Sequence, residues 1–298
     1  MGYMPVITNL AAPLLDFATL ECKTGVRFEA IKFASFSDMA DALRNDHIQV
    51  AFIIAPLSIV LRQQGSNIKI VYIGNRHEST LVVRKDLNIS SLRDLVGKTI
   101  AVPMRFSGHN ISILQLLEKN GLKGRVNVVE MNPPDMASAL TSGSLDAYYV
   151  GEPFAAQTVL NGTGKVLFYV EDVWKNFICN LVIVKQTLIE KNPELVKMLV
   201  QGAARSGLWA KHNPKEAARI ASFYWVQPVD LVEYALTTPK NRIVYDEFIP
   251  KESEIKHLAD LMVSYGLITD NNIDGLIDDR FAKEANQEGV TDFSSILK

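Results

Sequence analysis

Hydrophobic and polar positions in the first half of the chain alternate between two patterns. Short apolar runs rich in β-branched residues indicate strands at Val26–Phe33, Gln49–Ala55, Ile68–Gly74, Thr99–Val102, Val126–Glu130, Asp146–Val150 and Lys165–Val170. Stretches with helical spacing lie between them, at Asp38–Arg44, Leu57–Gln64, Ile111–Lys119 and Asp135–Leu140. This alternation predicts an α/β fold with mainly parallel sheets that carry helices on both faces.

Local signals support the predicted helix boundaries. Ser91-Leu92-Arg93-Asp94 has the spacing of a capping box. Asn132-Pro133-Pro134-Asp135 combines an N-cap residue, prolines suited to a first turn and an acid that suits the helix dipole. Gly65, Gly121 and Gly143 stand where three of the helices are expected to end.

The second half is predominantly helical and suggests two lobes. Helical patterns cover Pro193–Lys211, Pro214–Tyr224, Val229–Leu236 and Glu252–Tyr265, with a short strand-like run at Ile243–Tyr245. Two bare apolar runs, Leu81–Val83 and Leu181–Val184, bracket a middle segment of lobe size. We therefore expect residues 1–82 with 184–298 to form lobe I and residues 83–183 to form lobe II. The two apolar runs, the second extended to Asn180, would carry the hinge, with ligand held between facing strand ends.

Composition narrows the functional classes. The charges nearly cancel, at 31 Lys+Arg and 33 Asp+Glu, and no basic cluster suggests nucleic acid or an anionic membrane. No stretch reaches the roughly 18 apolar residues of a membrane helix, and Met1–Pro5 does not read as a secretory signal. The chain is then either cytosolic or the mature part of an exported protein. Cys22 and Cys179 lie far apart without metal-ligand spacing, so free, buried thiols are expected.

The segment from Val102 to Asn110 is the most informative one for binding. It follows a predicted strand and leads into a helix, so Ser107 can cap that helix and Gly108 allows close backbone approach. The helix N-terminus favours a carboxylate or another small anion. An ordinary capped helix with His109 facing solvent explains the same pattern equally well.

Two further clusters lie at predicted strand ends. Arg76 follows the strand Ile68–Gly74 and can pair with a planar anion, or with Glu78 in a solvated turn. Glu152 precedes Pro153 at a helix start, where it can accept hydrogen bonds, hold a hard cation or simply complement the helix dipole.

Motifs for catalysis are weak. The sequence has no GxSxG, HExxH, Walker loop or GxGxxG after a strand. His77, His109 and Glu152 are the residues that closure of the lobes can bring together as a metal or acid/base trio, and their spacing leaves that open.

Several motifs, in order, resemble the NMT1/THI5-like solute-binding proteins of ABC importers for nitrate, bicarbonate, taurine, alkanesulfonates and thiamine precursors. They are Gly2–Pro5 with Ala12–Leu14, Leu81–Asp86 with Leu92–Lys98, Val102–Asn110, Pro133-Pro134, Val150–Pro153, Asn192–Glu194 and Asp278–Phe281. The order and spacing are specific, although each motif alone is weak. The resemblance covers almost the whole chain.

This resemblance implies a two-lobed periplasmic-binding-protein (type II) fold. It also implies an ABC permease partner, a periplasmic or membrane-anchored extracellular location, and a cleft lined by Ser107, His109, Asn110 and Glu152. We expect no cofactor and no metal. We expect a monomeric, non-enzymatic protein for a small anionic or flat polar organic molecule. The residues expected at the ligand are Asn9, Phe36, Pro56, Arg76, His77, Ser107, His109, Asn110, Glu152 and Asn180. An enzyme on the same scaffold, of thiamine-pyrimidine or menaquinone-pathway type, and a ligand sensor remain the alternatives.

Overall fold

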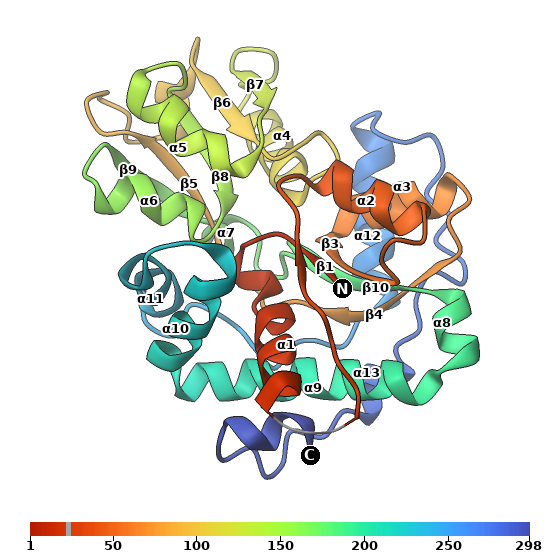
Figure 1. Ribbon diagram of the computed structural model, residues 1–298. Coiled ribbons are helices and arrows are strands. Elements are labelled where there is room, and N and C mark those ends of the chain that lie inside the picture. Colours follow the sequence, from red (N-terminus) through yellow and green to blue (C-terminus); the bar gives the residue numbers. More distant parts are fainter. Residues whose placement is uncertain (22–24) are drawn as a thin grey trace.

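Short apolar runs assemble into two separate sheets of five strands each (Figure 1). The computed structural model describes residues 1–21 and 25–298. The first sheet has the order β2-β1-β3-β10-β4, with β1 Gly2–Tyr3, β2 Ile31–Lys32, β3 Val50–Ile54, β4 Ile68–Ile73 and β10 Asn180–Lys185. The second has the order β7-β6-β8-β5-β9, with β5 Ser79–Arg84, β6 Thr99–Val102, β7 Asn127–Glu130, β8 Ala147–Gly151 and β9 Gly164–Tyr169. The α/β two-lobed fold expected from the sequence is confirmed.

In each sheet, four of the described strands run in the same direction and the fifth runs against them. The opposed strand is β10 in the first sheet and β5 in the second. Each of these two strands comes directly after a segment in which the chain crosses from the other lobe. The expected mainly parallel pattern therefore holds, apart from the two strands that enter after a crossing.

The crossings lie a few residues before the places the sequence suggested. The chain passes between the sheets at residues 74–78 and 174–179. The runs expected to carry the hinge, Leu81–Val83 and Asn180–Val184, lie inside β5 and β10 and are almost completely buried. An apolar run marks a central strand covered on both faces, so it cannot by itself mark a crossing.

Helices cover the faces of both sheets. They are α1 Ala11–Glu21, α2 Phe36–Arg44, α3 Ala55–Gln63, α4 Gly108–Lys119, α5 Pro133–Ser142, α6 Phe154–Leu160, α7 Val170–Val173, α8 Gln186–Lys191, α9 Pro193–His212, α10 Pro214–Trp225, α11 Val229–Thr237, α12 Glu252–Ser264 and α13 Arg280–Glu284. Three 3₁₀ turns are η1 Ile7–Asn9, η2 Leu92–Leu95 and η3 Phe293–Leu297. In the part of the chain described, no helix is both long enough and apolar enough to cross a bilayer.

Local sequence signals set several of these boundaries. The Ser107 hydroxyl accepts a hydrogen bond from the Asn110 N–H at the start of α4, and Ser91 forms the capping box of η2. Gly143 ends α5 in the left-handed conformation, with φ of 83°. Two strand predictions were too long, because Val26–Phe33 contributes only β2 and Ile243–Tyr245 makes a single bridge to Arg76.

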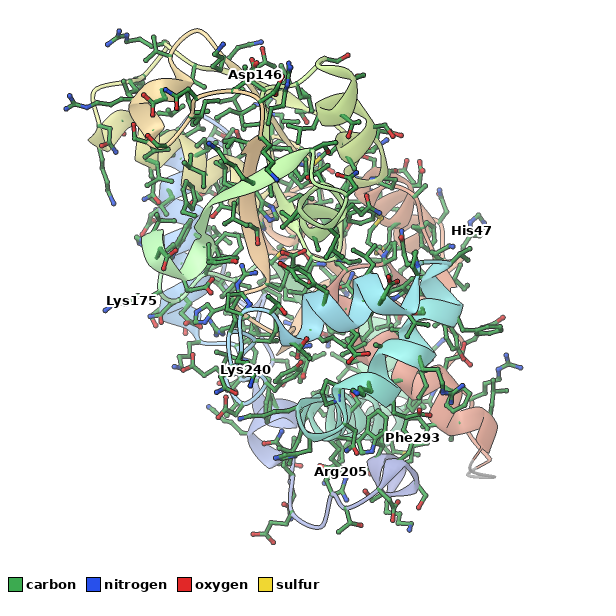
Figure 2. All side chains as sticks on the ribbon, turned by 90° about the vertical axis from the view of Figure 1, so that its left-hand side faces the viewer. His47, Asp146, Lys175, Arg205, Lys240 and Phe293 are labelled. Carbon is green, nitrogen blue, oxygen red and sulfur yellow. The ribbon has the colours of Figure 1, made fainter. Side chains whose placement is uncertain are left out.

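Most of the helical second half packs on the first lobe, although α11 also contacts α6 of the second. The 20-residue α9 runs along the lower lobe and packs against α1 (Figure 1). Asp146 lies at the opposite end of the molecule from Arg205 and Phe293, with Lys175 and Lys240 at an intermediate level (Figure 2). The C-terminal helices thus enlarge the lobe that contains both chain ends.

Candidate functional site

The residues that follow the parallel strands of both sheets meet in one apolar cluster. Met4 follows β1 and Phe33 follows β2, whereas Met104 and Met131 follow β6 and β7. All four belong to, or pack against, the same set of buried side chains. The carboxyl edges of the two sheets therefore face each other, which is where open α/β sheets bind ligands.

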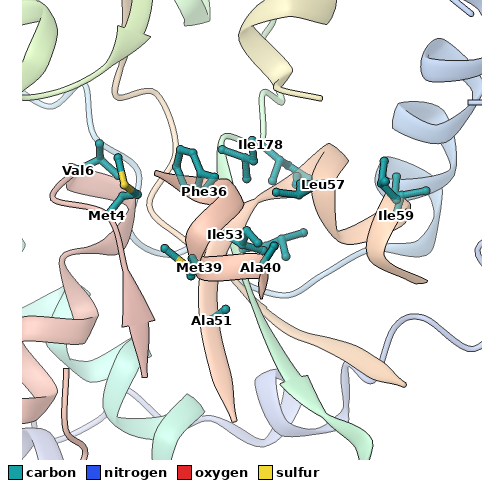
Figure 3. Close-up of a cluster of buried hydrophobic side chains, with 14 of the residues drawn as sticks. Met4, Val6, Phe36, Met39, Ala40, Ala51, Ile53, Leu57, Ile59 and Ile178 are labelled. Carbon is teal, nitrogen blue, oxygen red and sulfur yellow. The ribbon is translucent and has the colours of Figure 1, made fainter. Parts of the chain in front are cut away.

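Apolar side chains form the floor of this junction on the first lobe. Figure 3 shows Met4, Val6, Phe36, Leu57 and Ile178 along the side of the first lobe that faces the second. Each is at most 6% exposed. On the other side, Phe106 and Met131 are partly buried and pack against this cluster. The junction, which we call the apolar junction, offers hydrophobic and aromatic contacts to a ligand.

Arg242, in the segment after α11, connects the first lobe to the second. Its guanidinium lies 2.8 Å from the Glu171 Oε1 and 3.5 Å from the Glu152 Oε1. It also donates to the Thr80 hydroxyl at 3.0 Å and to the Ser79 carbonyl, and its side chain is 2% exposed. A buried arginine with this many partners is a structural tie between the lobes.

Beside Arg242, a second polar group surrounds the crossings. The His109 Nε2 lies 2.9 Å from the Ser79 Oγ, which donates at 2.9 Å to the Glu78 Oε1. Burial raises the pKa of Glu78 to about 7, against hydrogen bonds from Cys179 and Ser79 that lower it. Burial also lowers the pKa of His109 to about 3. At neutral pH the imidazole is therefore uncharged.

Arg76 is buried away from solvent and paired with helix α12. Its two terminal nitrogens lie 3.1 and 3.0 Å from the carboxylate oxygens of Glu254. It also donates to the carbonyls of Glu247 and Asn176, so it joins the first crossing to the second. The solvated Arg76–Glu78 turn considered as the alternative is not formed. A direct ligand contact by Arg76 stays a prediction.

The other expected site residues divide into two groups. The Asn180 amide donates to the Asn9 Oδ1 at 2.8 Å, and the Asn110 amide donates to the Arg105 carbonyl. The half-buried His77 donates from Nε2 to the Lys175 carbonyl, at 2.6 Å. By contrast, Phe36 and Pro56 stand at the starts of α2 and α3. Phe36 belongs to the cluster at the apolar junction, and Pro56 comes directly before Leu57, another member. The apolar members of the predicted site thus lie beside the apolar junction. Of these polar members, Asn9 pairs with Asn180 within the first lobe. Asn110 bonds within the second lobe, and His77 joins the two crossings.

The trio of His77, His109 and Glu152, whose convergence the sequence left open, is not the group that the structure brings together in the described part of the chain. Among the described residues, the ligand-type atoms that come together belong to Glu78, His109 and Cys179, all within 4.8 Å of one another. The Glu152 carboxylate instead accepts from the Thr80 hydroxyl and the Ala156 N–H. Cys179 is a free, buried thiol as expected, and Cys22 lies outside the described residues.

Comparison with known proteins agrees with this architecture. The model of the NMT1-like family matches residues 2–224. The chain belongs to the NMT1-like family. This NMT1-like protein is 28% identical over 271 residues to the taurine-binding periplasmic protein of Escherichia coli, covering 81% of this chain and 82% of that protein. It is 26% identical over 274 residues to a putative aliphatic sulfonates-binding protein of Bacillus subtilis, covering 89% and 80%.

Solved structures share the fold. A ligand-binding component of an ABC-type import system from Staphylococcus aureus, solved with zinc bound, matches with a TM-score of 0.84 at 23% identity, covering 96% of this chain and 98% of that one. The periplasmic nitrate-binding protein NrtA of Synechocystis PCC 6803 matches with a TM-score of 0.81 at 16% identity, covering 100% and 90%.

Sequence reasoning missed the polar core of the NMT1-like protein. Arg242 lies in an irregular segment after α11, and its partner Glu171 lies in the first turn of the four-residue helix α7. Arg242 does not follow a predicted strand, whereas Glu171 directly follows the predicted strand Lys165–Val170, so its position was a usable signal. Glu78 was named only as a possible partner for Arg76, although its position directly before β5 was a usable signal.

Proposed function

We propose that this NMT1-like protein is the solute-binding component of an ABC import system and that it closes its two lobes around a small molecule. The observation that carries the proposal is the apolar junction, where the carboxyl edges of two sheets face each other. Two short crossings connect the lobes, and closure is favoured because only the closed form lets a ligand contact both edges.

The relatives support this function and its setting. Their names describe binding of taurine, aliphatic sulfonates and nitrate, and two of them are periplasmic proteins by name. We infer that this chain works outside the cytoplasm as a monomer and docks on a permease in its closed form. The chain termini lie together in one lobe and the middle segment forms the other, so the lobes have the discontinuous arrangement that such closure uses.

The side chains favour an organic molecule with an apolar or aromatic part over a bare inorganic anion. Phe36, Leu57 and Phe106 provide flat or aliphatic surface. The two arginines buried at the crossings, Arg76 and Arg242, already pair with carboxylates of the protein. A ligand anion would have to displace those carboxylates, which costs several kcal/mol because it strands them without a partner.

The protonated state of the buried Cys179 thiol supports a binding protein over an enzyme with a cysteine nucleophile. Burial and the neighbouring Glu78 raise the pKa of Cys179 well above its usual range, and burial keeps His109 neutral. A cysteine nucleophile needs a thiolate, which forms beside a protonated histidine or another cation. Cys179 and His109 therefore form a neutral pair, which does not supply such a nucleophile.

A thermal-shift panel followed by calorimetry tests the proposal. The panel contains nitrate, bicarbonate, taurine, alkanesulfonates of increasing chain length, aminopyrimidines and flavin-like rings. A ligand that binds only the folded chain raises the melting temperature. We expect the shift to grow with the apolar area of the compound. Mass spectrometry of the bound compound checks that it is released unchanged, and conversion of the compound would favour the enzyme alternative.

A variant pair tests the site itself. Phe106→Ala removes part of the apolar junction and is expected to weaken binding of the panel ligand about 5- to 30-fold, the equivalent of about 1–2 kcal/mol of lost apolar contact. The matched control is Phe223→Ala on α10, whose ring is 81% exposed. Equal affinity in the two variants would place the ligand elsewhere.

A further inference from the structure

Three chemically different metal-binding groups meet at the crossings between the lobes. One carboxylate oxygen of Glu78, one imidazole nitrogen of His109 and the Cys179 sulfur lie within 4.8 Å of one another. All three residues are at most 5% exposed. We propose that Glu78, His109 and Cys179 bind one zinc-class transition-metal ion that links the two lobes.

The mixture of ligand types points to this class of ion. Thiolate, imidazole and carboxylate together are a ligand set for Zn²⁺, whereas Mg²⁺ and Ca²⁺ take oxygen ligands. Ligand atoms around one tetrahedral Zn²⁺ lie about 3.3–3.8 Å apart. The three groups therefore need to approach one another by at most about 1.5 Å, which side-chain rotation can provide.

The carboxyl groups around the site outnumber the cations that pair with them in the described chain. Three carboxylates, those of Glu78, Glu152 and Glu171, surround the single guanidinium of Arg242. In the described chain, the ion pairs of Arg242 are with Glu152 and Glu171, and none includes Glu78. The Glu78 carboxylate instead accepts from the Ser79 hydroxyl and from the Glu152 N–H at 2.8 Å. Burial raises the pKa of Glu78, and a bound divalent ion supplies the positive charge that holds this carboxylate ionised.

The imidazole of His109 is neutral, as ligation of a metal ion requires. The Ser79 hydroxyl donates to Glu78, so its oxygen accepts from the His109 Nε2–H. The other ring nitrogen, Nδ1, is buried and has no hydrogen-bond partner among the described residues. A shift of the proton to Nδ1 gives the other neutral tautomer, in which the Nε2 lone pair is available to an ion.

The position of the three residues gives the ion a structural consequence. Glu78 ends the first crossing and hydrogen-bonds through its backbone to Glu152 in the second lobe, at 2.9 Å. Cys179 ends the second crossing, and its carbonyl accepts from the Ala55 N–H at the start of α3, in the first lobe. An ion held by both residues and by His109 of α4 therefore joins the lobes at the hinge.

Close packing at the site depends on Gly151. A methyl group on Gly151 would lie 2.5 Å from the Glu78 Oε2, so only glycine lets the carboxylate take its position. Gly151 thus leaves the space in which the Glu78 carboxylate lies beside His109 and Cys179.

The test uses tag-free protein, stripped with a chelator and carrying Cys22→Ser, so that Cys179 is the only thiol. Zn²⁺ affinity is measured by competition with a chromophoric chelator, and Co²⁺ is added separately as a spectroscopic probe. We expect one ion per chain and a thiolate-to-cobalt charge-transfer band. Binding should release a proton from the thiol and therefore tighten as the pH rises.

Single substitutions identify the ligands. Cys179→Ser and His109→Gln should each weaken Zn²⁺ binding by at least about 100-fold, because even outer partners of metal ligands contribute about 10- to 100-fold. The matched control His212→Gln, at an exposed position on α9, should leave the affinity unchanged.

Three results would overturn the proposal. They are no stoichiometric Zn²⁺ binding, a Co²⁺ complex without the thiolate band, and equal loss of affinity in His212→Gln and His109→Gln. If a ligand variant does not fold, as judged by circular dichroism, the cobalt band of the Cys22→Ser protein still decides whether Cys179 is a ligand. Solute capture by the apolar junction is measured separately and does not depend on the outcome.

Discussion

Replacing Arg242 by methionine should destabilise the protein far more than replacing an exposed arginine. Arg242→Met keeps an unbranched apolar side chain but removes the guanidinium that neutralises Glu152 and Glu171. Those carboxylates have side chains that are 6% and 25% exposed, so solvent cannot fully replace the lost partner. Breaking a buried ion pair from one side costs about 3–5 kcal/mol.

The size of the effect follows from the length of the chain. With an unfolding entropy of about 2.1 cal/mol/K per residue, a loss of about 3–5 kcal/mol lowers the melting temperature by about 5–8 °C. Arg219 supplies the control, because its pair with Glu216 on α10 is exposed, at 58% and 48%. Arg219→Met should cost less than about 1 kcal/mol.

Urea unfolding and calorimetry of both variants make the comparison, with the double variant Arg242→Met/Glu152→Gln as a third sample. Neutralising Glu152 should recover part of the stability, because the penalty comes from the carboxylates left without a partner. If Arg242→Met is no less stable than Arg219→Met, or the double variant is less stable than Arg242→Met, Arg242 does not act as an electrostatic tie.

Two further substitutions probe the crossings. Arg76→Met should cost about 3–5 kcal/mol in urea unfolding, because it removes a buried guanidinium and strands Glu254, which is 14% exposed. Arg280→Met, which removes a guanidinium that is itself 58% exposed, should cost less than about 1 kcal/mol, and similar losses in both variants would contradict the role of Arg76. Gly151→Ala should lower the melting temperature, at a cost of about 1–3 kcal/mol, because the new methyl group overlaps the Glu78 carboxylate. In Gly207→Ala the nearest atom to the new methyl group, on the Tyr245 ring, is 3.3 Å away, so this control should cost less than Gly151→Ala. Equal losses in the two variants would show that the packing at Glu78 is loose.

The elements of the fold could be predicted from the sequence because they depend on local patterns. The alternation of apolar runs with helical spacing gave β3, β4 and β6–β9, and capping residues such as Ser107 marked helix starts. Position in a sheet could not be predicted in the same way. Leu81–Val83 has the composition of any central strand, so its pattern did not indicate that the crossing comes before it, at residues 74–78.

The site could be predicted only in part, for a related reason. Residues at strand ends are visible in a sequence, and Ser107, His109 and Glu152 do lie near the crossings. Their partners come from distant segments: Arg242 is 90 positions from Glu152, and Cys179 is 70 positions from His109. Only the packing of the two lobes determines whether such residues pair with the ligand or with each other. Arg76 and Asn180 are buried with protein partners for that reason.

The distance between the lobes in the presence of ligand tests the central claim most directly. Lys123 of the second lobe and Asn45 of the first are both exposed, so Lys123→Cys and Asn45→Cys in the Cys22→Ser background accept spin labels for pulsed electron paramagnetic resonance. A pair within the first lobe, Asn45→Cys with Lys191→Cys, is the control. With a panel compound that raises the melting temperature at saturation, we predict a shorter and narrower distance distribution between the lobes and an unchanged one within the first lobe. An inter-lobe distribution that does not change at saturating ligand would contradict capture by closure.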